Sequence, residues 1–230
     1  MVLQEPLEGV PLDASLRRKQ GDAGEGLGEL RAVAEAVAAL HRSGVVVERR
    51  RPIAPAVARL GVQARAAEIV SPDFGGRMRE LAGALGGSLP DLARWGEETS
   101  LVHGDCKPSQ FFVGPVGVAI LDFDHCGMAD PASDAGNFIA TLRQHAVRHE
   151  LKARAARMWP ARGPWLRGLK QSFVNAYLDA VGGGELERRI RWYQSASLVR
   201  KAYRSWQRSA RSPLPPALLQ EARACLPPNG

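Results

Sequence analysis

Cysteine is scarce in this sequence, and its scarcity excludes two kinds of architecture. The 230 residues contain only Cys106, Cys126 and Cys225. Three scattered thiols are too few for the disulfide framework of a small secreted domain and too few for a zinc site. We therefore interpret them as small, partly buried side chains.

Long apolar runs are also missing. No stretch approaches the roughly 20 consecutive apolar residues of a transmembrane helix, and the N-terminus lacks the basic-then-apolar pattern of a secretion signal. These absences predict a cytoplasmic location without membrane association. A hydrophobic content of 45% and a charged content of 24% are ordinary for a globular protein, and the length allows one or two domains.

Acidic residues are outnumbered by basic ones. Asp and Glu total 24 against 31 Lys and Arg, which gives a formal net charge of +7. Such a charge favours anionic partners, and ATP is one of them. It also argues weakly against a polycationic aminoglycoside as substrate, because a site for such a molecule should be rich in carboxylates.

Most of the recognisable chemistry lies in residues 101–124, LVHGDCKPSQFFVGPVGVAILDFD. Two β-prone runs flank the turn residues 114–117, which predicts a hairpin. A hairpin brings its two ends to the same edge of a sheet, so Asp105 and Gln110 at its entrance should lie near Asp122 at its exit.

Two carboxylates, one amide oxygen and Lys107 would then converge. Oxygen ligands of this kind invite a hard divalent cation, which predicts Mg²⁺ with phosphates completing its coordination. A carboxylate that is not bound to the metal can accept the proton of an attacking hydroxyl.

The pattern resembles the aminoglycoside phosphotransferase and choline kinase family, the small-molecule relatives of protein kinases. That family has a His-Gly-Asp loop with an amide five residues after the Asp, then a metal-binding Asp, and later an Asp-Pro followed by another Asp. The matching residues here are His103, Gly104, Asp105, Gln110, Asp122, Asp130, Pro131 and Asp134.

The resemblance implies that Asp105 is the catalytic base and that Lys107 contacts phosphate, both within a catalytic loop of residues 103–110. It further implies that other residues support the loop or touch ATP. The implied supports are His103 and Asp134, and the implied ATP contacts are Gln4, Glu5 and Lys107.

The implied metal ligands are Gln110 and Asp122, with a metal-binding segment at residues 122–124. Gln110 stands where most members of the family have Asn. Maltokinase-like members also carry Gln, and both amides offer a carbonyl oxygen. Two alternatives stay open for Asp124, which either assists the metal or faces solvent.

The resemblance also implies an architecture. Residues 13–230 would form the large C-terminal lobe of a protein-kinase-like fold, and residues 1–12 would be the remnant of the hinge that touches adenine. We expect the small N-terminal β lobe of the family to be absent from this chain, unless upstream sequence supplies it.

Helical periodicity predicts a mainly α protein with a small β-hairpin, an α+β fold. We place His41 on the surface at the last turn of one helix. Basic and aromatic residues interleave at 190–206, which we interpret as a core stripe beside a solvated basic face. The expected helices cover residues 27–41, about 55–69, 72–87, and stretches within 165–225.

Three functions are therefore open. The first is an ATP-dependent phosphotransferase that uses Mg²⁺ and acts on a hydroxyl of a sugar, an amino-alcohol or an aminoglycoside-like molecule. The second is a pseudokinase or fragment that lacks its nucleotide lobe and acts as a non-catalytic binding module. The third, which we favour least, is a basic nucleic-acid-binding protein; it predicts salt-sensitive binding with no need for Asp105.

Overall fold

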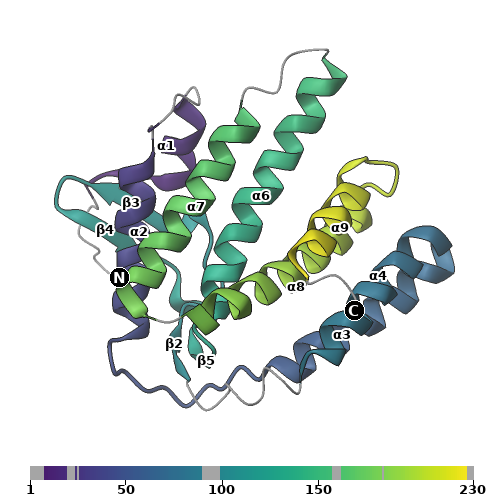
Figure 1. The fold of residues 1–230 in the computed structure, drawn as a ribbon, viewed down its shortest axis with the longest axis horizontal. Coiled ribbons are helices and arrows are strands. Elements are labelled where there is room, and N and C mark those ends of the chain that lie inside the picture. Colours follow the sequence, from purple (N-terminus) through teal and green to yellow (C-terminus); the bar gives the residue numbers. More distant parts are fainter. Residues whose placement is uncertain are drawn as a thin grey trace, which may run out of the picture.

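The computed structural model describes residues 8–19, 24, 26–89, 99–156, 162–182 and 184–226. Gln4 and Glu5, which we expected to contact ATP, lie outside these ranges. Figure 1 shows a mostly helical molecule with two small sheets, which confirms the predicted mainly α fold with a β-hairpin. Within the described residues, no helix combines the length and apolarity that crossing a membrane requires.

Helices form most of the molecule, and those predicted from periodicity are present. The helices are α1 (Leu12–Arg18), α2 (Leu27–His41), α3 (Ile53–Val70), α4 (Pro72–Gly87), α6 (Ala132–Ala155), α7 (Arg162–Val181), α8 (Gly184–Arg208) and α9 (Leu214–Cys225). Short 3-10 turns at Pro108–Gln110 and Phe123–His125 stand on either side of the hairpin.

Two small antiparallel sheets carry the central loops. One sheet contains β1 (Val10–Pro11), β3 (Phe111–Gly114) and β4 (Gly117–Ile120), and the other contains β2 (Ser100–Val102) and β5 (Gly127–Ala129). β3 and β4 form the predicted hairpin, with Phe111 opposite Ile120. The backbone N–H of Leu121 donates to the carbonyl of Gln110 at 2.9 Å, so the two ends of the hairpin meet at one edge.

The connection between α2 and α3 adds a further extended segment to the second sheet. Arg50 forms a parallel bridge to Met128 of β5. The Arg51 N–H donates to the Met128 carbonyl at 3.0 Å, and the Met128 N–H donates to the Arg49 carbonyl at 2.8 Å. This connection passes along β2 and β5 before it enters α3 (Figure 1).

One hydrophobic core lies between the hairpin, α2, α6 and α7. Phe138 of α6 stacks on Phe173 of α7 with ring centroids 4.3 Å apart, and it meets Phe111 of β3 edge-on at 5.7 Å. Aromatic pairs of this kind add about 0.5–1.5 kcal/mol each beyond the area they bury. The base of the hairpin, where Gln110 and Asp122 lie, is thereby fixed to two long helices.

A second core lies between α3, α4, α8 and α9. Phe74 of α4 stacks on Trp206 of α8 with ring centroids 5.5 Å apart. The α3–α4 connection is tight, because a Cβ on Gly75 would lie 2.2 Å from the backbone of Glu68. The two helices therefore run as a closely packed pair along one side of the molecule (Figure 1).

Candidate active site

The loop of residues 103–110 connects β2 to the hairpin and is shaped by one glycine. Gly104 has a φ of +79°, and a Cβ at this position would lie 2.1 Å from the carbonyl oxygen of His125. Left-handed backbone is costly for residues with a Cβ, and here the neighbouring backbone leaves no room for one. Residue 104 must therefore be glycine for the loop to reach the 123–125 turn.

Asp134, in the first turn of α6, holds the start of this loop. Its carboxylate accepts hydrogen bonds from the backbone N–H of His103 at 2.6 Å and of Gly104 at 2.9 Å. The side chain is only 1% exposed, so both bonds are shielded from water. Charge-assisted bonds in such surroundings are among the stronger ones in a protein.

His41 contacts the same carboxylate, which corrects the prediction that it lies on the surface. It is 7% exposed, its Nε2 lies 3.2 Å from Asp134 Oδ2, and its Nδ1 lies 2.6 Å from the Tyr177 hydroxyl. These partners fit one neutral tautomer: the Tyr177 hydroxyl donates to Nδ1, and Nε2–H donates to Asp134. The last turn of α2 faces the core at this point, so the helix dipole does not determine where His41 lies.

His103 joins the loop to the segment that follows the hairpin. Its Nε2 lies 2.6 Å from the carbonyl oxygen of Leu121, and the Asp105 N–H donates to its Nδ1 at 3.2 Å. A neutral imidazole with the proton on Nε2 satisfies both contacts. The His103 ring therefore connects the backbone at Asp105 to the backbone at Leu121, the residue before Asp122.

Asp105 is half-buried and lies among cations. Lys107 donates a hydrogen bond to its Oδ2. Burial raises the pKa of the Asp105 carboxyl, but the hydrogen bond and charge of Lys107 and the charge of Arg200 outweigh this effect and hold the pKa below its ordinary value. Asp105 is therefore ionised at neutral pH, as an acceptor of protons must be.

Gln110 and Asp122 lie side by side, although twelve residues separate them in sequence. Gln110 Nε2 donates to Asp122 Oδ2 at 2.9 Å. Asp122 has a φ of 60°, an uncommon conformation for a residue with a Cβ, and it turns the chain sharply out of the hairpin. Side chains that lie so close can present an amide oxygen and a carboxylate to the same ion.

The donor set of this pair fits Mg²⁺. Over the described ranges, no group of three or more His, Cys, Asp or Glu side chains is placed to hold a metal. Mg²⁺ does not need such a group, because it is commonly bound through one or two carboxylates together with substrate phosphates. Gln110 and Asp122 would hold it, and its charge would offset that of the phosphates when both are bound.

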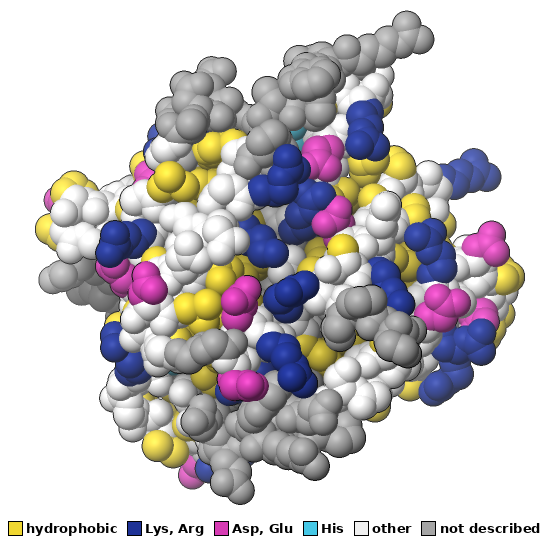
Figure 2. Space-filling view, in the orientation of Figure 1, with side chains coloured by type: hydrophobic (Ala, Val, Ile, Leu, Met, Phe, Trp, Pro, Cys, Tyr) yellow, Lys and Arg dark blue, Asp and Glu magenta, His cyan; other side chains and the backbone are white. Residues whose placement is uncertain are grey.

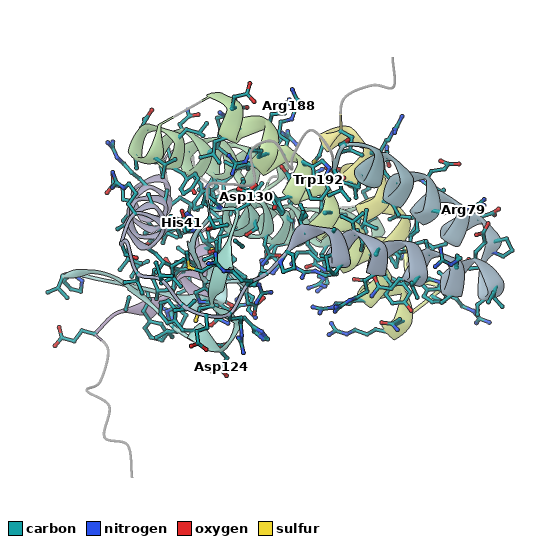
Figure 3. The ribbon with its side chains drawn as sticks, turned by 90° about the horizontal axis from the view of Figure 1, so that it is seen from below. His41, Arg79, Asp124, Asp130, Arg188 and Trp192 are labelled. Carbon is teal, nitrogen blue, oxygen red and sulfur yellow. The ribbon has the colours of Figure 1, made fainter. Side chains whose placement is uncertain are left out.

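Asp124 makes different contacts from Gln110 and Asp122. Its backbone carbonyl accepts a hydrogen bond from Arg49, and the carbonyl of His125 accepts one from Arg51. The Asp124 side chain is exposed at the outer edge of the molecule in Figure 3, whereas Asp130 lies among the packed helices. The structure thus fixes the backbone of this turn and leaves both alternatives for the carboxylate open.

Asn137 and Arg200 are close to the loop and were missed by the sequence reasoning. Asn137 Nδ2 donates to the carbonyl of Cys106 at 2.8 Å, and Arg200 donates to Asn137 Oδ1 at 3.0 Å. Helical spacing offered a signal for Asn137, because residues three apart on a helix share a face and Asp134 was already singled out. The Cys106 side chain beneath this contact is fully buried, and burial raises the pKa of its thiol, so the thiol stays protonated.

Two of the arginines on α8 depart from the expected solvated basic face. Arg189 is 4% exposed and its Nε donates to Asp130 Oδ2 at 3.0 Å, which ties α8 to the start of α6. Arg200 points toward the loop, as described above. Exposed basic residues such as Arg191 and Arg204 do form the predicted solvated face.

A cavity of about 590 Å³ opens next to the loop. It lies between the connection after α2, the start of α3 and the middle of α8, and it reaches the loop at Gly104 and α6 at Asp134 and Asn137. Trp192, which also lines it, lies between the sheets and the α3–α4 pair in Figure 3. Volumes of roughly 300–1,000 Å³ are typical of sites for small molecules.

Comparison with known proteins gives one family and several related folds. Residues 1–169 match the family model described as "Phosphotransferase enzyme family". A search of curated proteins gave no match.

Among solved structures, a glucosamine kinase (crystal form B) superposes with a TM-score of 0.66 at 19% identity, covering 94% of this chain and 58% of that one. A choline/ethanolamine kinase family protein from Mesorhizobium loti gives 0.59 at 15% identity, with 95% and 65% covered. Glucosamine kinase in complex with glucosamine, ADP and inorganic phosphate gives 0.59 at 18%, with 93% and 56% covered. At these identities the likeness shows the fold, and the chain spans less than two thirds of each of the three kinases.

Proposed function

The chain belongs to the phosphotransferase enzyme family, and from its site we propose that it transfers the γ-phosphoryl group of ATP to a hydroxyl of a small molecule. One observation carries the proposal. The ionised Asp105 shares a loop with Gln110, whose side chain contacts Asp122. A proton acceptor therefore lies on the same short loop as Gln110, one of two neighbouring oxygen ligands.

In the proposed reaction, the acceptor hydroxyl oxygen bonds to the γ-phosphorus, and the bond from that phosphorus to the β,γ-bridging oxygen breaks. The hydroxyl proton passes to Asp105, and ADP leaves. The pKa of Asp105 is depressed, so it acts by accepting the proton late in the transfer while it orients the hydroxyl. Mg²⁺ held by Gln110 and Asp122 would neutralise charge on the phosphates.

We assign Lys107 to the transferring phosphoryl group. It donates to Asp105 in the structure, where it is a third exposed. An ammonium group is a mobile point charge, so it can turn from the carboxylate to a phosphate oxygen without a change in the backbone. That movement would release the Asp105 oxygen for the acceptor hydroxyl.

The related kinases support the choice of donor and acceptor class. One glucosamine kinase holds glucosamine, ADP and inorganic phosphate, and another neighbour is a choline/ethanolamine kinase family protein. Both kinds of acceptor carry a free hydroxyl. We therefore assign ATP as donor and a small hydroxylated molecule as acceptor.

Asp105→Asn tests the proposal. It keeps the shape of the loop and removes the proton acceptor, so phosphoryl transfer to a panel of hydroxylated acceptors, followed by ³¹P NMR, should fall about 10²–10⁴-fold. Asp73→Asn is the matched control, because Asp73 is exposed on α4, far from the loop in sequence and in contacts. Wild-type turnover by Asp105→Asn would overturn the assignment of this residue as base.

A further inference from the structure

Resting on the proposed function, we propose that the acceptor carries a negatively charged group, a phosphate or a carboxylate, besides the hydroxyl that is phosphorylated. The reason is the wall of the cavity next to the loop, which is strongly basic. Five arginines from three separate parts of the chain line it: Arg49, Arg50, Arg51, Arg59 and Arg200.

None of these arginines forms a close ion pair among the described residues, although the charge of Arg200 is felt by Asp105. Arg49 and Arg51 donate to backbone carbonyls, and Arg200 donates to the amide oxygen of Asn137. Arg50 makes a long contact of 3.5 Å to the Thr99 hydroxyl. In the part of the chain that the structure describes, none of the five lies within 4.0 Å of a carboxylate oxygen.

Elsewhere the same chain pairs its partly buried arginines with acids. Arg143 Nε donates to Glu221 at 2.6 Å, and Arg189 is bound by Asp130. Arg49, Arg50 and Arg59 are exposed to solvent, whereas Arg51 and Arg200 are partly buried. Partial removal of a guanidinium from water without a carboxylate partner is costly, so Arg51 and Arg200 are expected where a ligand supplies the counter-charge. Lys and Arg side chains are also prominent on the α6–α8 face in Figure 2, but there acidic side chains stand among them.

The two acidic residues that line the cavity do little to offset the positive charge of its arginines. They are Asp124 and Asp134. The Asp134 carboxylate already accepts hydrogen bonds from two backbone N–H groups and contacts His41, so it is not available to a cationic ligand. A glucosamine or choline cation would therefore meet five arginines and one exposed carboxylate.

The anion bound here would be distinct from the phosphates of the nucleotide. Lys107, Gln110 and Asp122 do not line the cavity, which touches the loop only from the side of Gly104 and α6. Metal-bound phosphates belong at the Gln110–Asp122 pair. Asp105 does not line the cavity either, but its neighbour Gly104 does, so the cavity offers a separate anion site beside the loop that carries Asp105.

The rest of the cavity wall suits the uncharged, hydroxylated part of such an acceptor. Trp192 and Tyr193 give it an aromatic surface. Trp192 Nε1 and Gln63 Oε1 are buried and have no hydrogen-bond partner among the described residues, although both side chains line the cavity. Buried polar atoms are normally satisfied, so a rotation of either side chain toward the cavity would let a ligand hydroxyl or water supply the missing partner.

Calorimetric titration without ATP tests the inference, with four probes of similar size: glucose 6-phosphate, gluconate, glucose and glucosamine. We expect at least one of the two anions to bind about tenfold more tightly than both the neutral and the cationic sugar. Preference for glucose 6-phosphate or for gluconate identifies the anionic group as phosphate or carboxylate. Equal affinities, tighter binding of glucosamine, or binding of neither anion would overturn the inference.

A matched pair of variants locates the effect. Arg59→Gln and Arg65→Gln remove the same charge from exposed positions on α3, but only Arg59 lines the cavity. Arg59→Gln should weaken anion binding about three- to tenfold and Arg65→Gln should leave it unchanged. Equal effects would refute a site in this cavity. Because neither ATP nor turnover is involved, the result is independent of the Asp105→Asn assay.

Discussion

Replacement of Asp134 by Asn should loosen the loop of residues 103–110 and destabilise the whole fold. The carboxylate is buried and receives three donors: the N–H groups of His103 and Gly104 and, in the tautomer assigned here, Nε2–H of His41. Asn keeps one acceptor oxygen, but it loses the charge and turns an NH₂ group toward donors.

The size of the loss follows from the number of donors. Hydrogen bonds to a charged group are worth about 1.5–3 kcal/mol each, so the loss of two should cost about 3–6 kcal/mol. Domains are stable by only about 5–15 kcal/mol, and for a chain of this size each kcal/mol corresponds to about 2–4 °C in Tm. We therefore expect Tm to fall by about 6–24 °C.

Thermal unfolding followed by circular dichroism measures this shift. Asp73→Asn, in the exposed first turn of α4, serves as the control, and its change should stay within a few tenths of a kcal/mol. If Asp134→Asn shifts Tm no more than Asp73→Asn, the carboxylate does not hold the loop as described. Native-state hydrogen exchange at His103 and Gly104 gives a second readout, because their amides should lose protection before the core helices do.

Two further changes test other features of the site. Burial and the neighbouring Arg200 lower the pKa of Lys201 from 10.5 to about 7, so between these pH values the unfolded chain binds more protons and stability rises with pH. Lys201→Met should therefore raise the free energy of unfolding below pH 7, by at most about 5 kcal/mol, and this gain should vanish toward pH 10.5. Urea unfolding at several pH values measures the gain, and a gain that does not change with pH would contradict the argument. Gly104→Ala should abolish transfer and cost several kcal/mol, because its Cβ would overlap the His125 carbonyl, whereas Gly83→Ala on α4, with open space around it, should be neutral or stabilising by about 0.5–1 kcal/mol. Equal behaviour of the two alanine variants would refute the steric argument.

Local patterns in the sequence predicted much of this arrangement. The hairpin followed from turn residues between two β-prone runs, and its geometry placed Gln110 beside Asp122, which the 2.9 Å contact between them confirms. Helical periodicity predicted α2, α3 and α4 to within a few residues. These features depend on residues close together in the chain, where periodicity and turn chemistry are informative.

Contacts between distant segments were not predictable in the same way. His41 reaches Asp134 across 93 residues, and its position depends on how α2 packs against α6 and α7. The segment around Arg50 has the composition of a solvated connection, yet it pairs with β5 because the backbone groups of Met128 remain unpaired on that edge. The apolar stripe of α2 reaches His41 four residues after Val37, which signals that His41 is buried but not that it meets Asp134. The pairing of Arg50 with β5 has no comparable signal in a single sequence.

The connection after α2 has a consequence for how the two ligands would influence each other. Arg49 and Arg51 line the cavity and at the same time hold the carbonyls of Asp124 and His125, just after Asp122. An anion that draws either guanidinium away from its carbonyl would change the freedom of the turn that begins at Asp122. If the chain binds acceptor, Mg²⁺ and nucleotide as proposed, acceptor binding and nucleotide binding would be linked equilibria, and thermodynamic reciprocity would require each to alter the affinity of the other by the same factor.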